Sequence, residues 1–376
     1  MEGHRVKVMT LHTEKHPFQP QALDASYVDE TRVEAIFADT ELNLRDAASH
    51  LITGESYHLS RFHVPEMEIA IEEVLRCEVF DVVLLESLFT TSYIPAIRRL
   101  SHAEVILRAH NVEHLLWEEV SANMNAGPKK WMLNHFQSKL QEEEIRIAGA
   151  VDGIVAMTPG DASWFQKMLS EHFPGRRVKV LHLSFGLDVE HAPHENIQES
   201  PNQVLHLGSM DWTPNLQGVT WFMESVWPLV RENAPEALLK LAGRNMPPDW
   251  KTQQSEGIVI LGEVENASTT YDTPSIVVIP LHAGSGMRIK LTEALAAGRP
   301  VVTTSKGMEG LPVQHREQVL VTDSPEEMAT AIVHLLENGS EAIQLGIRGR
   351  AWARENLDHS AKARALTRCL SDWVNS

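Results

Sequence analysis

Residues 274–311 constrain the fold of this chain more strongly than any other stretch. Residues 276–279 are four consecutive β-branched apolar side chains, which is typical of a strand buried on both faces of a parallel sheet. A glycine-rich loop follows, and then a helical pattern over 287–297 that ends at Gly298. Pro300 and two valines then open a second buried strand. The order strand, glycine loop, helix, strand predicts an α/β fold built on a parallel sheet.

The glycine loop lies just outside the carboxyl end of the first of these strands and at the amino end of the helix. An open α/β sheet binds anionic ligands at this place, because the first N–H groups of a helix have no partners within it. We therefore expect a phosphate-binding site there. The residues assigned to it are Gly284, Ser285, Gly286, Met287 and Arg288.

Two charged residues, Lys290 and Glu293, share one face of that helix because they are three positions apart. Glu293 also follows Ile289 by four positions, which places it beside the stripe that we expect to face the core. One interpretation is a surface ion pair, which is common and weak. The other is a ligand site, in which the carboxylate accepts two hydrogen bonds from a ribose diol while the helix amino end holds phosphates. The loop at 306–311 converges on the same sheet edge, and this favours the ligand site.

This stretch resembles the C-terminal signature of retaining nucleotide-sugar glycosyltransferases of the GT-B fold, family 4. The segments that carry the resemblance are 284–290, 293–298 and 300–302. Members of that family usually have two glutamates separated by seven residues, and the resemblance implies that Glu293, as the second, binds the donor ribose. Ser285 stands where the first glutamate would be, so the chain departs from the family at the contact with the donor sugar.

The resemblance implies two Rossmann-like domains that face a cleft, and 376 residues suit two domains that each bury a core. Both halves of the chain alternate strands and helices. We assign residues 1–185 to an N-terminal, acceptor-side domain and residues 203–357 to a C-terminal domain that binds the nucleotide sugar. Residues 186–202 are polar and contain prolines, which is typical of a linker. Residues 358–376 are expected to form a helix that returns to the N-terminal domain, as is usual in this fold.

The first eight residues resemble the junction between the first helix and the second strand of the family, with a Gly-His pair ahead of a strand. The resemblance implies a strand, a glycine-rich loop and a helix before them, so we expect that the sequence begins late and that its N-terminal domain is truncated. The other interpretation is that residues 5–11 are this protein's own first strand. A sheet without its central strand exposes unpaired backbone and apolar faces, so we expect this chain to be less stable or self-associating in its N-terminal domain, and inactive or nearly so in transfer.

A second informative place is residues 105–114, where a strand ends and a helix begins. His110 and Asn111 stand at the carboxyl end of this strand, and the resemblance implies that His110 contacts the donor sugar. The other interpretation is a histidine with a purely structural role. Asn111 is also a candidate N-cap of the following helix. Further along, the run of three glutamates at 142–144 indicates a solvated helix face.

Cationic partners for a diphosphate are expected besides the backbone amides. Many relatives supply an arginine and a lysine from the region after the first strand of the C-terminal domain, but residues 208–224 contain neither. Arg288 and Lys290 are the available substitutes, and Arg244 follows the next strand. The sequence has no Asp-x-Asp pair, so we expect no metal ion and no cofactor besides the donor substrate.

The composition limits the class of partner. A net charge of −18 does not suit nucleic acid or an anionic lipid surface unless a local basic patch exists. One short basic and aromatic cluster, at 128–131, is more typical of the start of a solvated helix, which leaves at most peripheral membrane contact. Cys77 and Cys369 fit no metal or redox spacing, no apolar run approaches membrane-spanning length and no signal-peptide pattern opens the chain. We therefore expect a reduced, cytoplasmic protein.

The resemblance implies a retaining hexosyl-type glycosyltransferase (EC 2.4 class), and the sequence features above are consistent with it. It would move a sugar from a nucleotide-sugar donor to a saccharide or glycolipid acceptor in polysaccharide or cell-envelope glycan biosynthesis. Relatives have no well-placed protein nucleophile, so we name no catalytic base, and His110 would position and polarise the donor. The alternative is a non-catalytic protein, derived from such an enzyme, that binds a nucleotide sugar or a protein partner.

Overall fold

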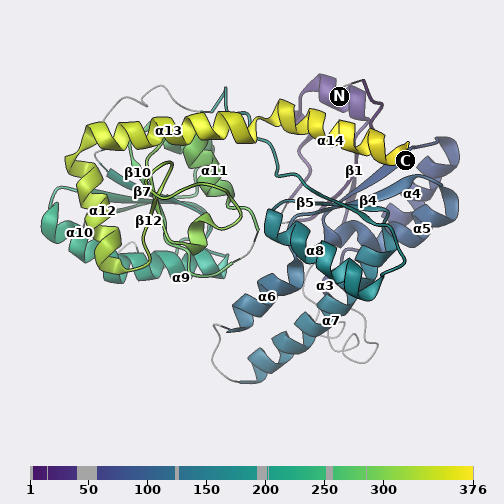
Figure 1. Cartoon of the computed structure of the whole chain (residues 1–376), viewed down its shortest axis with the longest axis horizontal. Helices are drawn as coiled ribbons and strands as arrows, with labels where there is room; N and C mark the ends of the chain where they lie inside the picture. Colours follow the sequence, from purple (N-terminus) through teal and green to yellow (C-terminus); the bar gives the residue numbers. More distant parts are fainter. Residues whose placement is uncertain are drawn as a thin grey trace. The chain divides into compact units, whose positions relative to one another are not determined.

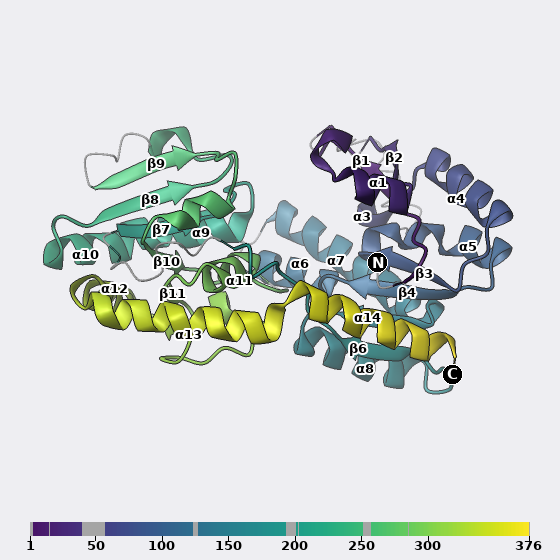
Figure 2. The same cartoon turned by 90° about the horizontal axis from the view of Figure 1, so that it is seen from above.

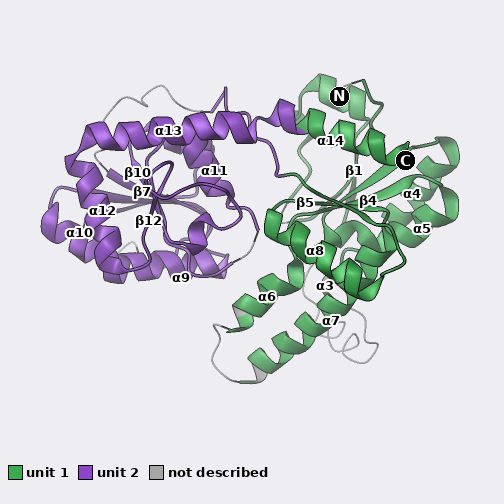
Figure 3. Cartoon of the chain, in the orientation of Figure 1, with its two compact units in different colours: residues 1–183, 363–376 green, residues 184–362 purple. Residues whose placement is uncertain are grey.

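The structure, a computed structural model of the 376-residue chain, describes residues 3–14, 16–39, 57–122, 127–192, 201, 203–250, 257–284 and 286–375. The chain divides into two compact units (Figure 3): residues 1–183 with 363–376, and residues 184–362. Each unit is built on parallel β-strands covered by helices (Figures 1 and 2). No helix in the described part of the chain is long and apolar enough to cross a membrane. Both cysteines are free thiols.

The first unit contains two parallel sheets, and among its described residues no strand pairing joins them. The smaller sheet pairs β1 (Met9–His12) with β2 (Glu34–Phe37). The larger has the order β3-β4-β5-β6, with β3 (Val82–Glu86), β4 (Glu104–Ala109), β5 (Gly153–Ala156) and β6 (Lys179–His182). The described helices of this unit are α1 (Ala25–Thr31), α3 (Tyr57–Ser60), α4 (Pro65–Cys77), α5 (Ile94–Leu100), α6 (Glu113–Ala122), α7 (Pro128–Ala150) and α8 (Pro159–His172), together with α14 (His359–Val374) from residue 363 onward.

The C-terminal helix α14 packs on one face of the four-stranded sheet. Leu366, Leu370 and Trp373 recur at helical spacing and contact the sheet around the fully buried Ile106. A Cβ on Gly153, in β5, would lie 2.3 Å from the Trp373 ring, so glycine at this position lets the indole lie directly on the strand. The opposite face of the sheet carries the main core of the unit, to which α4, α5, α7 and α8 all contribute.

The amino end of α6 is capped by a buried carboxylate from α7. Glu144 is 1% exposed and accepts hydrogen bonds from the backbone N–H groups of Glu113 (2.9 Å) and His114 (3.3 Å) and from Nδ1 of the His114 ring (2.7 Å). The interpretation of residues 142–144 as a solvated face is therefore wrong for Glu144, because the helix turns this member of the run toward α6. Asn111 donates to the Glu113 carboxylate at 3.3 Å.

We expect Glu144→Ala to destabilise the first unit by on the order of 3–5 kcal/mol, because it leaves the His114 ring and two helix N–H groups without their acceptor. Thermal melting together with hydrogen exchange of peptides from α6 measures the loss. Glu142→Ala is the matched control, since the Glu142 side chain is 65% exposed on the same helix and its removal should cost under about 1 kcal/mol. Equal losses in the two variants would contradict the capping role.

The described strands of the second unit form a six-stranded parallel sheet with the order β12-β11-β10-β7-β8-β9. Figure 2 shows β11, β10, β7, β8 and β9 of this unit following one another in this order. Its strands are β7 (Gln203–Leu207), β8 (Leu238–Ala242), β9 (Ile258–Gly262), β10 (Ile276–Ile279), β11 (Val301–Thr303) and β12 (Leu320–Val321). Its helices are α9 (Thr213–Trp221), which continues through a π-helical segment (Phe222–Val226) into α10 (Trp227–Asn233), then α11 (Ile289–Ala296), α12 (Pro325–Glu337) and α13 (Gly339–Leu357).

Both faces of this sheet are buried, because successive side chains of a strand point to opposite faces. On β10, Ile276 and Val278 belong to the core that includes α9, α10 and α12, whereas Val277 and Ile279 belong to the core that includes α11 and α13. All four are at most 1% exposed. The prediction of a strand at 276–279, buried on both faces, is confirmed.

The helix expected over 287–297 is present as α11, but it begins two residues later than expected, at Ile289. Ile289 is 56% exposed, so the expectation that it lies on the core-facing stripe is wrong. The buried face is formed by Leu291, Ala294 and Leu295, which are all fully buried. The buried face of α11 is therefore rotated by part of a turn from the face that the sequence indicates.

Candidate functional site

The candidate site lies where the strand order of the second unit reverses. β7 and β10 are neighbours in the sheet although the chain between them forms β8 and β9, so the loops that follow these two strands start from one point. Residues 208–212 follow β7, and residues 280–288 follow β10. In open α/β sheets, the crevice at such a point is where ligands bind.

Two glycines give the loop after β10 its shape. Gly284 and Gly286 have φ angles of 109° and 78°, in the left-handed region that glycine adopts without strain. A Cβ on Gly284 would also lie 2.9 Å from the indole of Trp212, which belongs to the loop after β7. The glycines thus let the two loops approach closely. Met287 is partly buried, and Ser285 lies outside the described residues.

Arg288 ties this loop to the next one. Its side chain is buried, and its guanidinium donates to the carbonyl oxygens of Gly284 (2.5 Å) and Lys306 (3.3 Å). A carboxylate oxygen of Glu309 lies 3.5 Å from the guanidinium and 2.6 Å from the amine of Lys306. The sequence assigns Arg288 to a diphosphate, whereas among the described residues its guanidinium meets the carbonyl oxygens of Gly284 and Lys306 and the carboxylate of Glu309.

The Lys290 amine points toward the loop after β7. It donates a hydrogen bond to Oδ1 of Asn215, a buried residue in the first turn of α9, and Asn215 Nδ2 donates to the carbonyl oxygen of Ser209 (2.9 Å). Burial and the positive charge of Arg288 lower the pKa of Lys290 to about 7, although Glu293 acts in the opposite direction. Near neutral pH the Lys290 amine is therefore protonated only in part of the molecules.

His206, on β7, is a neighbour of Lys290 that the sequence analysis did not single out. Its ring is 1% exposed, Nδ1 donates to the carbonyl oxygen of Val278 (3.0 Å), and the buried Nε2 has no hydrogen-bond partner among the described residues. Burial and the nearby charge of Lys290 lower the pKa of His206 to about 3, so the ring is neutral. A polar residue within the apolar run of β7 is the signal that could have pointed to it.

Glu293 lies one turn further along α11, near the buried hydroxyl of Tyr271, which has no hydrogen-bond partner among the described residues. Burial raises the pKa of Glu293, while the Tyr271 hydroxyl and the charge of Lys290 oppose the rise. Burial and the carboxylate together raise the pKa of Tyr271 well above its usual value. Within the described residues no ion pair joins Lys290 to Glu293, since the lysine amine is turned toward Asn215. The interpretation of a simple surface ion pair is therefore not what the structure shows.

We expect Glu293→Gln to weaken binding of a nucleoside diphosphate by on the order of 1.5–3 kcal/mol, because a ribose diol loses a charged acceptor. The stability of the second unit should change by less than about 1 kcal/mol. Calorimetry with UDP and thermal melting measure the two effects. Glu326→Gln, at an exposed carboxylate of α12, is the control and should leave both unchanged. An unaltered affinity of the Glu293 variant would count against the ribose role.

The remaining assigned residues lie at other strand ends. Arg244 follows β8, is partly exposed, and its carbonyl oxygen accepts from the N–H of Met210 (2.9 Å), which joins the loops after β7 and β8. His110 belongs to the first unit and follows β4. Its Nε2 lies 3.1 Å from Glu86 at the end of β3, and Arg108 donates to the other oxygen of that carboxylate (3.0 Å).

Glu86 is the residue of this first-unit cluster that the sequence analysis missed. Burial acts to raise the pKa of Glu86, but the hydrogen bond with His110 and the charge of Arg108 outweigh it and lower the pKa. The carboxylate is therefore ionised at neutral pH and orients the exposed His110 ring. The signal in the sequence is that Glu86 and His110 both end strands that are consecutive in a parallel sheet.

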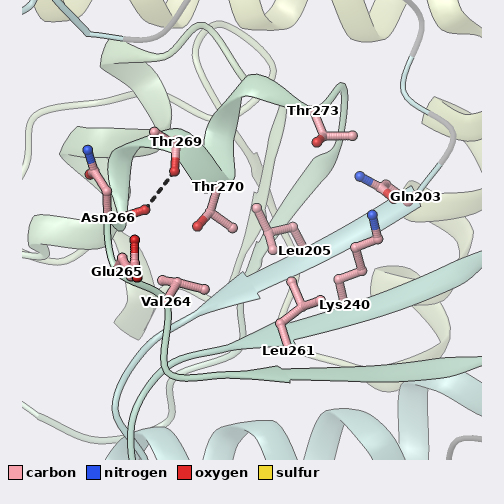
Figure 4. A pocket seen from close by; sticks show the side chains of 10 residues that line it. All are labelled: Gln203, Leu205, Lys240, Leu261, Val264, Glu265, Asn266, Thr269, Thr270 and Thr273. Carbon is pink, nitrogen blue, oxygen red and sulfur yellow. Dashed lines mark hydrogen bonds between the residues drawn. The ribbon is translucent and has the colours of Figure 1, made fainter.

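A groove of about 480 Å³ lies on the sheet of the second unit (Figure 4), and none of its lining residues belongs to the glycine loop after β10. Leu205, Lys240 and Leu261 form its floor on β7, β8 and β9, and Thr269 and Thr270 form part of its wall. Between β9 and β10 the described chain forms a short 3₁₀ turn (Ser268–Asp272), to which these two threonines belong. In the described residues no group of three or more His, Cys, Asp or Glu side chains could hold a metal ion.

Comparison with known proteins agrees with the geometry of the second unit. Residues 201–338, which lie within the second unit, match the family model described as Glycosyl transferases group 1. A protein of Klebsiella pneumoniae described as an uncharacterized 44.6 kDa protein in the cps region is 24% identical over 300 residues. These are 77% of this chain and 74% of that protein.

Solved structures resemble the whole chain in fold. Anabaena Alr3699/HepE, solved in complex with UDP, aligns with a TM-score of 0.63 at 13% identity, over 98% of this chain and 100% of that one. TarM aligns with a TM-score of 0.60 at 15% identity and covers 82% of this chain, whereas this chain spans 58% of TarM. The expected fold class is confirmed: the chain has the GT-B fold, with two Rossmann-like domains.

Proposed function

We propose that the protein is a retaining glycosyltransferase that moves a sugar from a nucleotide-sugar donor to a saccharide or glycolipid acceptor. The observation that carries the proposal is the arrangement at the strand-order reversal of the second unit. A glycine loop lies there just before α11, and an amine and a carboxylate lie within one turn of each other on that helix. These groups match in order the phosphates and the ribose of a nucleoside diphosphate. The Glycosyl transferases group 1 match over this unit supports the same ligand.

Each residue receives a role on this proposal. The N–H groups near Gly286 and Met287 and the amine of Lys290 bind the diphosphate and stabilise the charge that develops as the sugar leaves. Glu293 binds the ribose. Arg288 holds the glycine loop in shape against residues 306–309, and His110, oriented by Glu86, contacts the donor sugar. No protein nucleophile is assigned, and the leaving phosphate assists the acceptor hydroxyl, which gives retention.

The biological setting is proposed from the relatives. The Klebsiella protein comes from a cps region, and Alr3699/HepE binds UDP in its solved structure. We therefore propose polysaccharide or cell-envelope glycan synthesis as the pathway class and UDP-sugars as the first donors to test. A cytoplasmic location and the absence of a metal requirement belong to the same proposal.

A second function is a non-catalytic protein that binds a nucleotide sugar. The observation that favours it is Ser285, which stands where the resembling family has a glutamate facing the donor sugar. The two functions differ in one measurement, because a binding protein retains UDP-sugar affinity but does not consume the donor in the presence of any acceptor.

We expect the segment 184–362 alone to bind UDP, because the glycine loop, Lys290 and Glu293 all belong to that unit and it has its own buried core. Calorimetry with UDP, GDP, TDP and ADP tests this. Removal of the other unit should leave the affinity for the preferred nucleotide within about tenfold of the full chain. No binding of any of the four nucleotides would refute the site assignment.

We expect His110→Ala to lower the rate of sugar transfer on the order of 100-fold while leaving the affinity for UDP unchanged, because a polarising contact to the reacting sugar is lost. Donor consumption with a panel of saccharide and glycolipid acceptors measures the rate. His102→Ala, at an exposed histidine near the opposite end of β4, is the control and should retain full activity. Equal rates for the two variants would remove His110 from the reaction.

A further inference from the structure

We propose that Lys290 is a proton-coupled ligand of the donor: its amine takes up a proton when the diphosphate of a nucleotide sugar binds, and Asn215 positions it for this. The inference rests on the proposed function, because it assigns a behaviour to the same site. It goes further in that it specifies the protonation change that accompanies binding.

Three polar groups converge on the backbone of Gly208, at the end of β7. A Cβ on Gly208 would lie 2.8 Å from Lys290 Nζ, 2.9 Å from Asn215 Nδ2 and 3.1 Å from His206 Nε2. Gly208 is itself fixed, since its N–H donates to the carbonyl oxygen of Ala242 (2.9 Å). The absence of a side chain at Gly208 therefore lets the lysine amine occupy this place.

The acceptor that holds the amine is neutral. Lys290 donates a hydrogen bond to Oδ1 of Asn215. Nδ2 of the same amide donates to the carbonyl oxygen of Ser209, and this orients the amide so that its oxygen faces the lysine amine. Among the described residues no carboxylate lies within ion-pair distance of the amine. A neutral acceptor fixes the position of the amine without compensating a positive charge on it.

The charged and titratable groups around the amine come from three elements. Arg288, just before α11, adds positive charge, and Glu293, on α11, adds a negative charge beside the Tyr271 hydroxyl. His206, on β7, is neutral. Burial and Arg288 outweigh Glu293, and the pKa of Lys290 falls to about 7. The empty site therefore favours the uncharged amine above that pH.

Binding of a diphosphate reverses this preference. At pH 8 an amine with a pKa of about 7 is about one-tenth protonated, and a bound anion raises the pKa so that a proton is taken up from the solvent. The sugar phosphate bond then breaks, and the nucleoside diphosphate that leaves carries one more negative charge than it did in the donor. A protonated Lys290 stabilises this added charge.

The test is calorimetry of the full chain with UDP-glucose, GDP-mannose, TDP-glucose and ADP-glucose at about pH 8. Each titration is made in two buffers of different ionisation enthalpy. The phosphates of a nucleotide sugar are fully ionised at this pH, so the ligand exchanges no proton through them. We expect the nucleotide sugar that binds to take up about 0.9 proton per site.

Variants assign the proton to Lys290. Lys290→Arg keeps the positive charge in a group that stays protonated, so binding should persist with an uptake below about 0.2 proton. Asn215→Asp gives the amine a charged partner, which keeps the proton on Lys290 before the ligand arrives, so uptake should fall and affinity should drop roughly tenfold. Lys240→Arg, in the separate groove on β8, is the matched control and should leave both uptake and affinity unchanged.

The outcomes separate this inference from the proposed function. Binding by the unchanged protein without proton uptake would overturn the inference and leave the nucleotide site intact. Uptake that persists in Lys290→Arg would assign the proton to another group and also overturn it. Failure of all four nucleotide sugars to bind would overturn the proposed function, and the inference with it.

Discussion

The parallel pairing of β7 with β10 is the contact on which the candidate site depends. Ile276 and Val277 lie in register with Val204 and Leu205, and these four side chains are almost completely buried in the two cores of the second unit. The pairing joins segments that are far apart in the chain, and it brings the loop after β7 beside the loop after β10. Apolar burial, which is not directional, thereby fixes the relative positions of polar groups that need defined geometry.

Arg288 and Lys290 are both cationic and only two positions apart, but their side chains have different roles because they meet different hydrogen-bond acceptors. The planar guanidinium of Arg288 meets carbonyl oxygens of Gly284 and Lys306, and a buried guanidinium with several acceptors acts as a brace between loops. The amine of Lys290, two positions later, meets one amide oxygen of Asn215. Arg288 thus holds the glycine loop in shape. The positive charge of Lys290 is not balanced by a carboxylate within ion-pair distance among the described residues, so on the proposed function Lys290 is the cation that binds an anion.

Local patterns were sufficient to predict the strand at 276–279, the helix that follows, the glycine loop and the alternation of strands and helices in both halves. They failed where a contact is distant in sequence. The run of three glutamates indicates that Glu144 is solvated, yet Glu144 lies on α7 and caps the amino end of α6. Ile289 reads as a core residue because it is apolar, yet only tertiary packing decides which face of α11 is buried. His206 and Asn215 were missed for the same reason. Both residues are far from Lys290 in the sequence, and only the folded sheet brings them close to its amine.

Burial shifts the two titratable groups of α11 in opposite directions, and each shift favours the uncharged form. It lowers the pKa of Lys290 to about 7 and raises the pKa of Glu293. On the proposed function, a donor reverses both shifts at once, because its diphosphate favours the ammonium and its ribose diol donates hydrogen bonds that favour the carboxylate. A ligand with only a phosphate or only a diol reverses one of the two pKa shifts. On the proposed function, the three-residue spacing of Lys290 and Glu293 on one helix would couple recognition of the two halves of a nucleotide, so that the complete molecule would bind better than its parts.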